Sequence, residues 1–180
     1  MAATIYDIIQ MTMVACGGTV TGSTAMQKLL YFQSLKIPEV HAVINDHVHR
    51  YYGPFSRNVQ GALLSLASFD LIRIELRSWG NDGYVYRFSE GGEGCARRAA
   101  EKYAATYDQI CGIVQMCRDA CGLRGIVMSC AAKSHHIMVE NDEHGYDADQ
   151  MSSMVESAWR MDPSDARAGA KLLRSLDLTR

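Results

Sequence analysis

Apolar residues recur with helical spacing in the first part of the chain. In the segment 4–15 they spread around one helical face, and Gly17-Gly18 follows at a position where glycine commonly ends a helix. A second helix is expected to begin at Ser23-Thr24, because these residue types cap helix N-termini, and Pro38 marks its end. Its predicted core positions are Met26, Leu29, Leu30 and Phe32.

The next segment, Glu39–Arg50, does not decide between helix and strand. Its valines and isoleucine have helical spacing, whereas the alternation from His47 to Tyr52 suits a short strand. Gly53-Pro54 interrupts either structure, and Ser56 stands where a helix N-cap is expected. A third helix is therefore predicted from about Arg57 to Phe69.

Two segments of alternating apolar and polar residues follow, at 71–77 and 84–88. They predict the strands of a hairpin, joined by a turn at 79–83. A long helix is predicted from Glu90 to about Ala120, with Gly122 ending it. Two or three shorter helices should complete the chain, interrupted at 141–145 and at Pro163.

Three helices followed by a two-stranded hairpin are the element order of a winged helix. We therefore predict a mainly α chain with a small β-hairpin (α+β). A winged-helix-like domain would cover residues 1–102, with its wing at about 71–88. Residues 103–180 would form a C-terminal helical extension packed on that domain. In this arrangement the third helix is the one presented to a groove.

Charge and composition narrow the classes of partner. The chain has 180 residues, 48% of them hydrophobic, and a formal net charge of −2. Residues 50–102 carry 8 basic and 6 acidic side chains, whereas residues 103–180 carry 8 basic and 11 acidic ones. A polyanion would therefore bind the middle of the chain, although proteins that bind nucleic-acid phosphates are usually more basic than this one.

Six cysteines occur in a chain whose start lacks a basic segment and whose first apolar stretch is interrupted by Asp7. No run is as long as a membrane span, so we predict a reducing cytoplasm, free thiols and no membrane contact. His47 with His49, and His135-His136, are interpreted as surface or capping histidines. No zinc-type pair of cysteines is present, and we expect neither a metal nor a cofactor.

Catalysis is the least supported class of function. Cys130 with His135 or His136 could in principle form a nucleophile pair, but no nucleophile elbow or oxyanion loop surrounds it. Gly91-Gly92-Glu93-Gly94 lacks the lysine of a phosphate-binding loop. We therefore predict a protein that is not an enzyme.

Two motifs resemble a known group of proteins. The sequence QKLLYF at 27–32, followed by YYGPFS at 51–56, resembles the YwgA-like bacterial and archaeal proteins. It is similar, more distantly, to the Panacea (SocA-like) antitoxin domain. The resemblance implies a winged-helix-like core with a helical tail, and Panacea domains act through protein partners, chiefly toxins. The chain departs from the Panacea pattern around 39–49, so antitoxin activity is not carried over.

The YYGPFS motif is the leading candidate for function. In one interpretation, Ser56 caps the third helix and aims its first amides at an anion, with Arg57, Asn58 and Gln60 as contact residues. In the other, Tyr51, Tyr52 and Phe55 anchor the core and the Gly-Pro pair sets chain geometry; we favour this for the aromatic residues. On the wing, Arg77, Trp79 and Arg87 could follow a minor groove or belong to a solvated hairpin.

Two hypotheses result. The first is a DNA-binding transcriptional regulator that uses the third helix and the wing. It would act as a homodimer through the long helix, whose predicted surface residues are Tyr103, Tyr107, Val114 and Met116. The second is a protein-interaction module of the same fold that binds no DNA, such as an antitoxin-like, defence-associated or phage-encoded regulator. The near-neutral charge, Leu64 on the third helix and the acidic C-terminal third favour the second.

Overall fold

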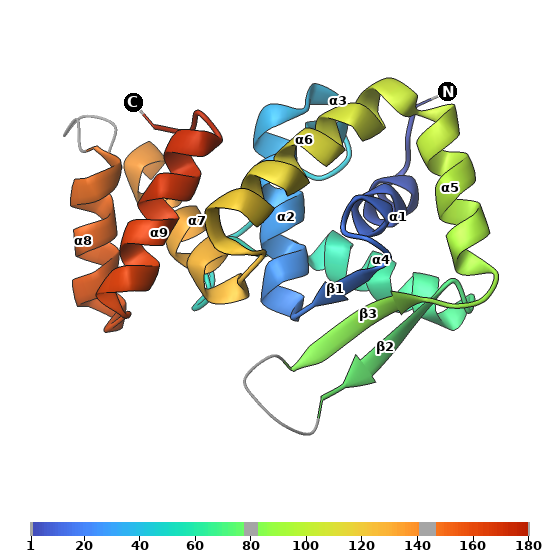
Figure 1. Ribbon diagram of the computed structural model, residues 1–180, viewed down its shortest axis with the longest axis horizontal. Helices are drawn as coiled ribbons and strands as arrows, with labels where there is room; N and C mark the ends of the chain where they lie inside the picture. Colours follow the sequence, from blue (N-terminus) through green and yellow to red (C-terminus); the bar gives the residue numbers. More distant parts are fainter. Residues whose placement is uncertain (1, 78–82, 141–146, 180) are drawn as a thin grey trace.

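The computed structural model describes residues 2–77, 83–140 and 147–179, which form a mainly helical body with a small antiparallel sheet (Figure 1). In chain order the elements are α1 (Ile5–Ala15), β1 (Thr19–Thr21), α2 (Ser23–Lys36), α3 (Pro38–His41), α4 (Arg57–Ser68), β2 (Ile72–Leu76), β3 (Tyr84–Phe88), α5 (Gly92–Lys102), α6 (Ala104–Cys121), α7 (Gly125–Glu140), α8 (Ala148–Trp159) and α9 (Pro163–Ser175). The predicted fold class, mainly α with a small β-hairpin, is confirmed.

The first helices follow local sequence signals. Thr4 caps α1 through a capping box with Asp7, and α1 ends just before Gly17-Gly18, where both residues have φ of 84°. Strand β1 was not predicted, because three residues are too short to show an alternating pattern. It forms because β3 has a second edge to pair with, and Val20 lies opposite Tyr86 there.

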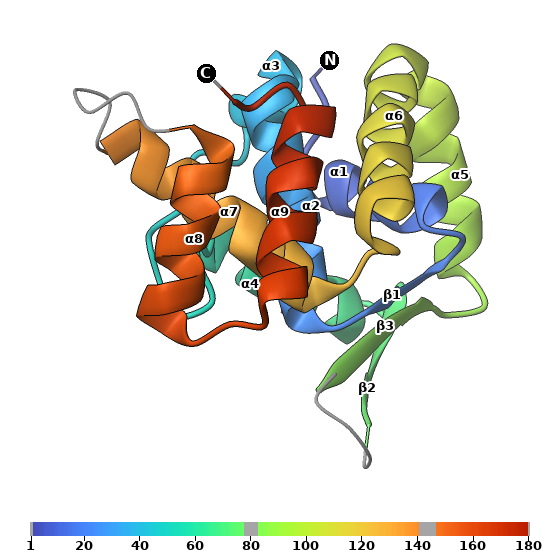
Figure 2. The same cartoon turned by 60° about the vertical axis from the view of Figure 1, so that its left-hand side comes forward.

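The predicted hairpin is present as β2 and β3, and the strand order of the sheet is β1-β3-β2. Ile74 of β2 and Val20 of β1 both lie opposite Tyr86, so apolar side chains share the face that packs on the helices. The hairpin extends away from the helical body in two views (Figures 1 and 2). The predicted turn at 79–83 lies almost wholly outside the described residues.

The single long helix predicted from Glu90 to Ala120 is wrong, because α5 ends at Lys102 and α6 begins at Ala104. At the break, Tyr103 has φ of −116° and its hydroxyl donates a hydrogen bond to the carbonyl of Ala2 at 3.2 Å. Both helices pack against α1 (Figure 1). A change of direction at Tyr103 lets each half bury its own apolar side on that helix.

The same packing removes the surface that was predicted for a homodimer. Val114 is buried, and Tyr103, Tyr107 and Met116 are partly buried against the hydrophobic core. These side chains are therefore used within the chain, and that part of the prediction is wrong. A homodimer through another surface stays a prediction.

The C-terminal helices join the same core. Helix α7 lies against both α2 and α9, and α8 packs on α7 and α9. The core is continuous from Ile8 in α1 to Leu173 in α9, so the two predicted parts of the chain share it. Across the described ranges, no helix is both long and apolar enough to cross a membrane.

Candidate functional site

Ser56, which was predicted to face a partner, is fully buried and shapes the start of α4. Its hydroxyl accepts a hydrogen bond from the amide of Val59 at 3.0 Å and donates one to Asp46 at 2.5 Å. The other carboxylate oxygen of Asp46 accepts the amide of Asn58 at 3.1 Å. A carboxylate of the chain thus lies at this helix start, where an external anion was predicted.

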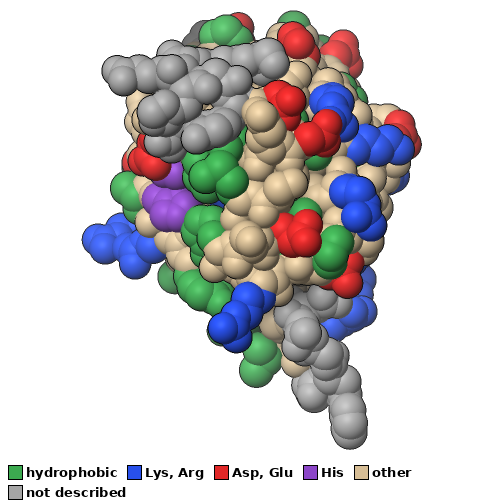
Figure 3. All heavy atoms as spheres, turned by 90° about the vertical axis from the view of Figure 1, so that its left-hand side faces the viewer, with side chains coloured by type: hydrophobic (Ala, Val, Ile, Leu, Met, Phe, Trp, Pro, Cys, Tyr) green, Lys and Arg blue, Asp and Glu red, His purple; other side chains and the backbone are tan. Residues whose placement is uncertain are grey.

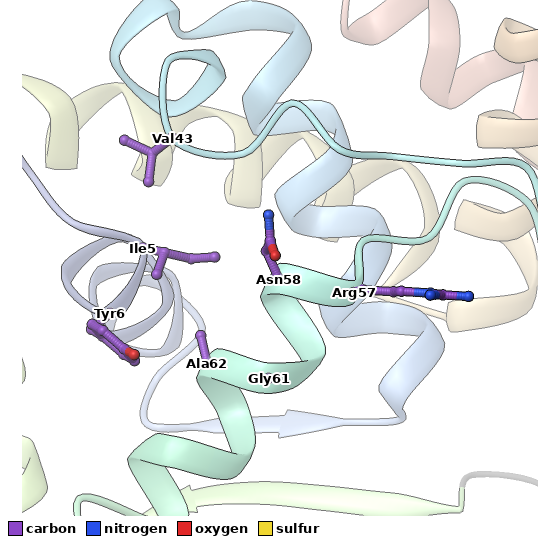
Figure 4. Close-up of a pocket in the computed structure, with 7 residues that line it drawn as sticks. All are labelled: Ile5, Tyr6, Val43, Arg57, Asn58, Gly61 and Ala62. Atoms are coloured by element: carbon purple, nitrogen blue, oxygen red, sulfur yellow. The ribbon is translucent and has the colours of Figure 1, made fainter.

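Arg57, Asn58 and Gln60 lie on the first turn of α4. Arg57 and Asn58 are exposed, and Gln60 is half-buried. A pocket of about 330 Å³ separates this turn from α1 and from the loop after α3. In Figure 4, Asn58 points towards the space between Ile5 and Val43, whereas Arg57 points away from it. The pocket walls combine apolar side chains, such as Ile5 and Val43, with the polar side chain of Asn58.

On the β2–β3 hairpin, which was predicted to be a wing, Arg87 interacts with other residues of the sheet. Its guanidinium lies 3.5 Å from the carboxylate of Glu75 and donates a hydrogen bond to the hydroxyl of Thr19 at 3.2 Å. Arg77 is exposed, and its amide closes the hairpin by donating to the carbonyl of Gly83 at 2.9 Å. Trp79 lies outside the described residues.

Between α3 and α4 the chain forms a small β-hairpin over residues 47–56, called the 47–56 hairpin below. Val48 and Phe55 exchange two backbone hydrogen bonds of 2.9 Å, and Arg50 and Gly53 exchange two more of 2.8 and 3.2 Å. Gly53 has φ of +86°, a left-handed conformation that suits the end of such a turn. The segment after Glu39 therefore shows parts of both alternatives, because Val40 belongs to helix α3 and Val48 pairs with Phe55 in an isolated β-bridge.

Two adjacent side chains of α2 hold the base of this hairpin. The side-chain amide of Gln27 donates to the carbonyl of Ser56 at 3.1 Å and accepts its amide at 3.0 Å. The ammonium of Lys28 donates to the carbonyl of Pro54 at 2.6 Å. The QKLLYF and YYGPFS motifs, which carry the family resemblance, therefore contact each other directly.

Tyr51 and Tyr52 form the tip of the hairpin and point outward. They are 71% and 57% exposed, and their rings meet edge to face at 4.9 Å. Their predicted role as core anchors is wrong, because Gly53 occupies the buried position. A Cβ at Gly53 would lie 3.2 Å from Cγ of Lys133 and 3.4 Å from Cε of Lys28, so only a residue without a side chain fits there.

Lys133 of α7 lies beneath the tip. The residue is 2% exposed, and its ammonium sits 4.5 Å from the ring centroid of Trp159 and 5.5 Å from that of Tyr51. Both distances are within the range of cation–π attraction. A lysine from one helix is thus covered by aromatic rings from the hairpin and from the end of α8.

Two histidines extend this arrangement. The ring of His49 stacks on that of His136 at 4.7 Å, with 7° between the ring planes, and lies 6.3 Å from Trp159. Figure 3 shows histidine side chains flanked by hydrophobic ones on this side of the molecule. We call the set His49, Tyr51, Tyr52, His136 and Trp159 the aromatic surface.

The remaining two histidines of the site pack below that surface. Nδ1 of His135 lies 2.9 Å from the hydroxyl of Tyr31, with which it shares a hydrogen bond, and the His47 ring meets Tyr31 edge to face at 5.1 Å. His47, His135 and His136, which were interpreted as surface or capping histidines, are half-buried. Only His49 of these four is exposed.

Burial lowers the pKa of the basic groups at this site. It lowers the pKa of Lys28 to about 7, with the charge of Lys133 as a second cause, and it lowers the pKa of Lys133. Burial also lowers the pKa of His47 to about 4, against the opposing attraction of Asp46. The pKa of His49 is lowered by burial and then by the neighbouring His136.

The geometry does not support the conceivable cysteine–histidine pair. Burial raises the pKa of Cys130 to about 12, and its sulfur lies 3.2 Å from the sulfur of Met161. A thiol in that state is a poor nucleophile. In the part of the chain that the structure describes, no three metal-binding side chains lie close enough together to hold an ion.

Comparison of the sequence with models of known protein families gives no match, and a search among curated proteins gives none either. The resemblance to the YwgA-like proteins therefore stays a prediction.

Sequence reasoning missed Lys28, Lys133 and Trp159 as members of one site. The available signal was local: Lys28 and Lys133 each stand among apolar residues on a helix, where a lysine is unusual.

Proposed function

We propose that the chain is a non-catalytic binding protein of winged-helix architecture, and that its aromatic surface binds a protein partner. The observation that carries the proposal is the exposure of Tyr51 and Tyr52 on a turn that is rigidly held from below. Gln27 and Lys28 fix the base of the hairpin, and the hydroxyl of Ser129 donates to the carbonyl of Tyr52 at 2.8 Å. The tip therefore presents its rings without an ordering cost on binding.

The composition of the aromatic surface supports a protein rather than a nucleic acid as the partner. Tyrosine and tryptophan are the residue types that dominate binding energy at protein interfaces, because they bury a large area with few rotatable bonds. Val48, 49% exposed, and Met154, 44% exposed, belong to the hairpin and to α8, the two elements that supply most of the rings.

The winged-helix part of the proposal is supported by topology. The order α1-β1-α2-α4-β2-β3, with sheet order β1-β3-β2, agrees with that architecture. Helix α4 would then be the helix presented to a groove. Its start is neutralised by Asp46, and Leu64 on its outer face is 56% exposed, so this helix also suits protein contact.

A site-specific photo-crosslinker tests the proposal in cells that produce the full chain. Placed at Tyr51, it should give a discrete crosslinked species, because the tip would lie within the interface. Placed at Leu35, a residue of α2 that is 37% exposed, it should give none. Equal crosslinking at both positions, or none at Tyr51, would refute the aromatic surface as the binding site.

DNA binding is the second candidate function, and one observation favours it. None of the twelve residues of α4 is acidic, and Arg57 and Asn58 are exposed at its start, as a helix that enters a major groove requires. Selection from a pool of random duplexes tests it. A duplex selected on the unmodified chain should bind Arg57→Ala less tightly and with a shallower salt dependence, and should bind the control Arg167→Ala unchanged. No enriched duplex, or equal affinity for the two variants, would refute DNA binding through α4.

We also propose a reducing compartment for the protein. All six cysteines are unpaired in the structure, and Cys117 and Cys130 are buried as small core residues. Quantitative alkylation of six thiols in protein unfolded directly from cells would agree with this, and fewer than six would contradict it.

A further inference from the structure

Two lysines lie side by side in the interior, and no carboxylate of the described chain pairs with them. Lys28 and Lys133 are each 2% exposed, and both pack against Gly53. Lys28 uses one of its three N–H donors on the carbonyl of Pro54. Within the described ranges no Asp or Glu forms an ion pair with either lysine, and the ammonium of Lys133 has no hydrogen-bond acceptor there.

This arrangement is costly for the isolated chain. Buried charges are normally paired, because removing an ammonium from water loses hydration that an apolar interior does not replace. The rings of Trp159 and Tyr51 recover part of that loss by cation–π attraction, but they accept no strong hydrogen bond. Repulsion between Lys28 and Lys133 adds to the cost. Within the described residues the two lysines therefore have no negatively charged partner.

The groups around Lys133 do not supply a negative charge to its ammonium. His49 and His136 are neutral or cationic side chains, and the carboxylate of Glu140 lies beside the His136 ring, 3.0 Å from its Nε2. From the 47–56 hairpin, the carbonyl of Pro54 accepts a hydrogen bond from Lys28 and not from Lys133. An anion that satisfies Lys133 has to come from outside the described chain.

We infer that Lys133 is the binding site for a carboxylate carried by an acidic segment of a protein partner. The partner's Asp or Glu would accept hydrogen bonds from the Lys133 ammonium, and apolar residues beside it would pack on Tyr51 and Trp159. Charge complementarity selects the carboxylate, and the aromatic cover selects a peptide over a small inorganic ion. This inference rests on the proposed function, and it names the chemistry of the partner.

The site would favour such a segment for a second reason. A carboxylate at Lys133 attracts the ammonium of Lys28 as well, so binding stabilises the charged form of both lysines. Binding should therefore take up protons near neutral pH, where the lowered pKa of Lys28 leaves part of its population neutral. The interaction is expected to weaken as pH rises from about 6 to 9.

A displayed library of random peptides, selected on the full chain, provides the probe. Selected peptides should be enriched in Asp or Glu next to apolar residues. Their affinity, measured by fluorescence anisotropy, should fall about tenfold or more for Lys133→Met, since the loss of one member of a desolvated charge pair has an effect of that order. Lys171→Met removes the same charge from an exposed position of α9 and should leave the affinity unchanged.

A double-mutant cycle decides between direct contact and an indirect effect. The best peptide and its Asp→Asn or Glu→Gln form are measured on the unmodified chain and on Lys133→Met. If the carboxylate contacts Lys133, the peptide change should cost about tenfold on the unmodified chain and little on the variant. Additive losses would overturn the inference. Methionine matches lysine in length and suits a buried site, and thermal melting followed by circular dichroism verifies folding.

The outcomes also separate this inference from the proposed function. Peptides that lose affinity on Tyr51→Ala but not on Lys133→Met would leave the aromatic surface as a binding site and overturn the carboxylate. Selected peptides without acidic enrichment would overturn it too. Peptides that bind Tyr51→Ala and Lys133→Met as tightly as they bind the unmodified chain would refute both proposals.

Discussion

Replacement of Lys28 by Met should change the stability of the protein with opposite signs at low and high pH. In the folded chain the pKa of this lysine is lowered from 10.5 to about 7, chiefly by burial. Between these two values the folded protein holds fewer protons than the unfolded chain, so unfolding takes up protons and stability rises with pH. Below about pH 7 the folded protein bears the full cost of the buried charge.

The magnitude follows from two opposing contributions. The difference in pKa between 10.5 and about 7 corresponds to roughly 5 kcal/mol at low pH. Lys28→Met would remove that cost, but it would also leave the buried carbonyl of Pro54 without its hydrogen bond, at about 1–3 kcal/mol. The substitution should therefore stabilise the protein by about 2–4 kcal/mol at pH 6 and destabilise it by about 1–2 kcal/mol at pH 10.

Urea denaturation followed by circular dichroism at pH 6, 8 and 10 measures these free energies. The matched control is Lys171→Met on the exposed face of α9, for which neither the free energy of unfolding nor its dependence on pH should change. The two curves for Lys28→Met and the unmodified protein should cross between about pH 8 and 10. A variant that is destabilised to the same degree at every pH would refute the reasoning, because the lysine would then carry no buried charge.

Three further predictions concern the elements that hold the 47–56 hairpin. Gly53→Ala should destabilise the protein by about 1–3 kcal/mol in thermal unfolding, because its φ is +86° and its Cβ would crowd two lysines, whereas Gly61→Ala in α4 should stabilise by up to about 1 kcal/mol. Gln27→Leu should cost about 1–3 kcal/mol in urea denaturation, because it leaves the buried amide of Ser56 unpaired, whereas the Ser56 carbonyl keeps its bond from the Gln60 amide. Asp46→Ala should cost about 0.5–2 kcal/mol at pH 7. Although burial raises the pKa of Asp46, hydrogen bonds from Ser56 and Asn58 lower it overall. The stability that Asp46 contributes should therefore disappear as pH falls below the usual carboxyl range. A difference in stability between Asp46→Ala and the unmodified protein that persists at about pH 2 would contradict this.

The local elements could be predicted because their signals lie close together in the sequence. Thr4 and Ser56 cap helices within a few residues of themselves, and the alternation at 71–77 and 84–88 identifies strands β2 and β3. The break at Tyr103 could not be predicted in the same way. The apolar spacing there suits one helix, and the bend depends on α1, against which both halves pack.

In the candidate site, too, some features follow from the local sequence and others depend on tertiary packing. The YYGPFS motif marks the correct segment, and Gly53-Pro54 correctly indicates a turn there. The direction of the tip does not follow from the motif, because tyrosines beside a turn occur both in cores and on surfaces. Gln27 and Lys28 decide it, since they bind the backbone of residues 54–56 and thereby leave Tyr51 and Tyr52 outside.

The sequence by itself thus determined the bounds of α1, α2, α4 and the β2–β3 hairpin, the α+β class and the turn at Gly53, because these depend on short-range backbone preferences and hydrogen bonds. Only the tertiary structure decided that Lys28 and Lys133, more than a hundred residues apart in the chain, lie beside the same glycine under Trp159 and Tyr51. Packing of α7 against α2 creates that neighbourhood. Burial and unpaired charge are properties of such a neighbourhood and not of either lysine alone.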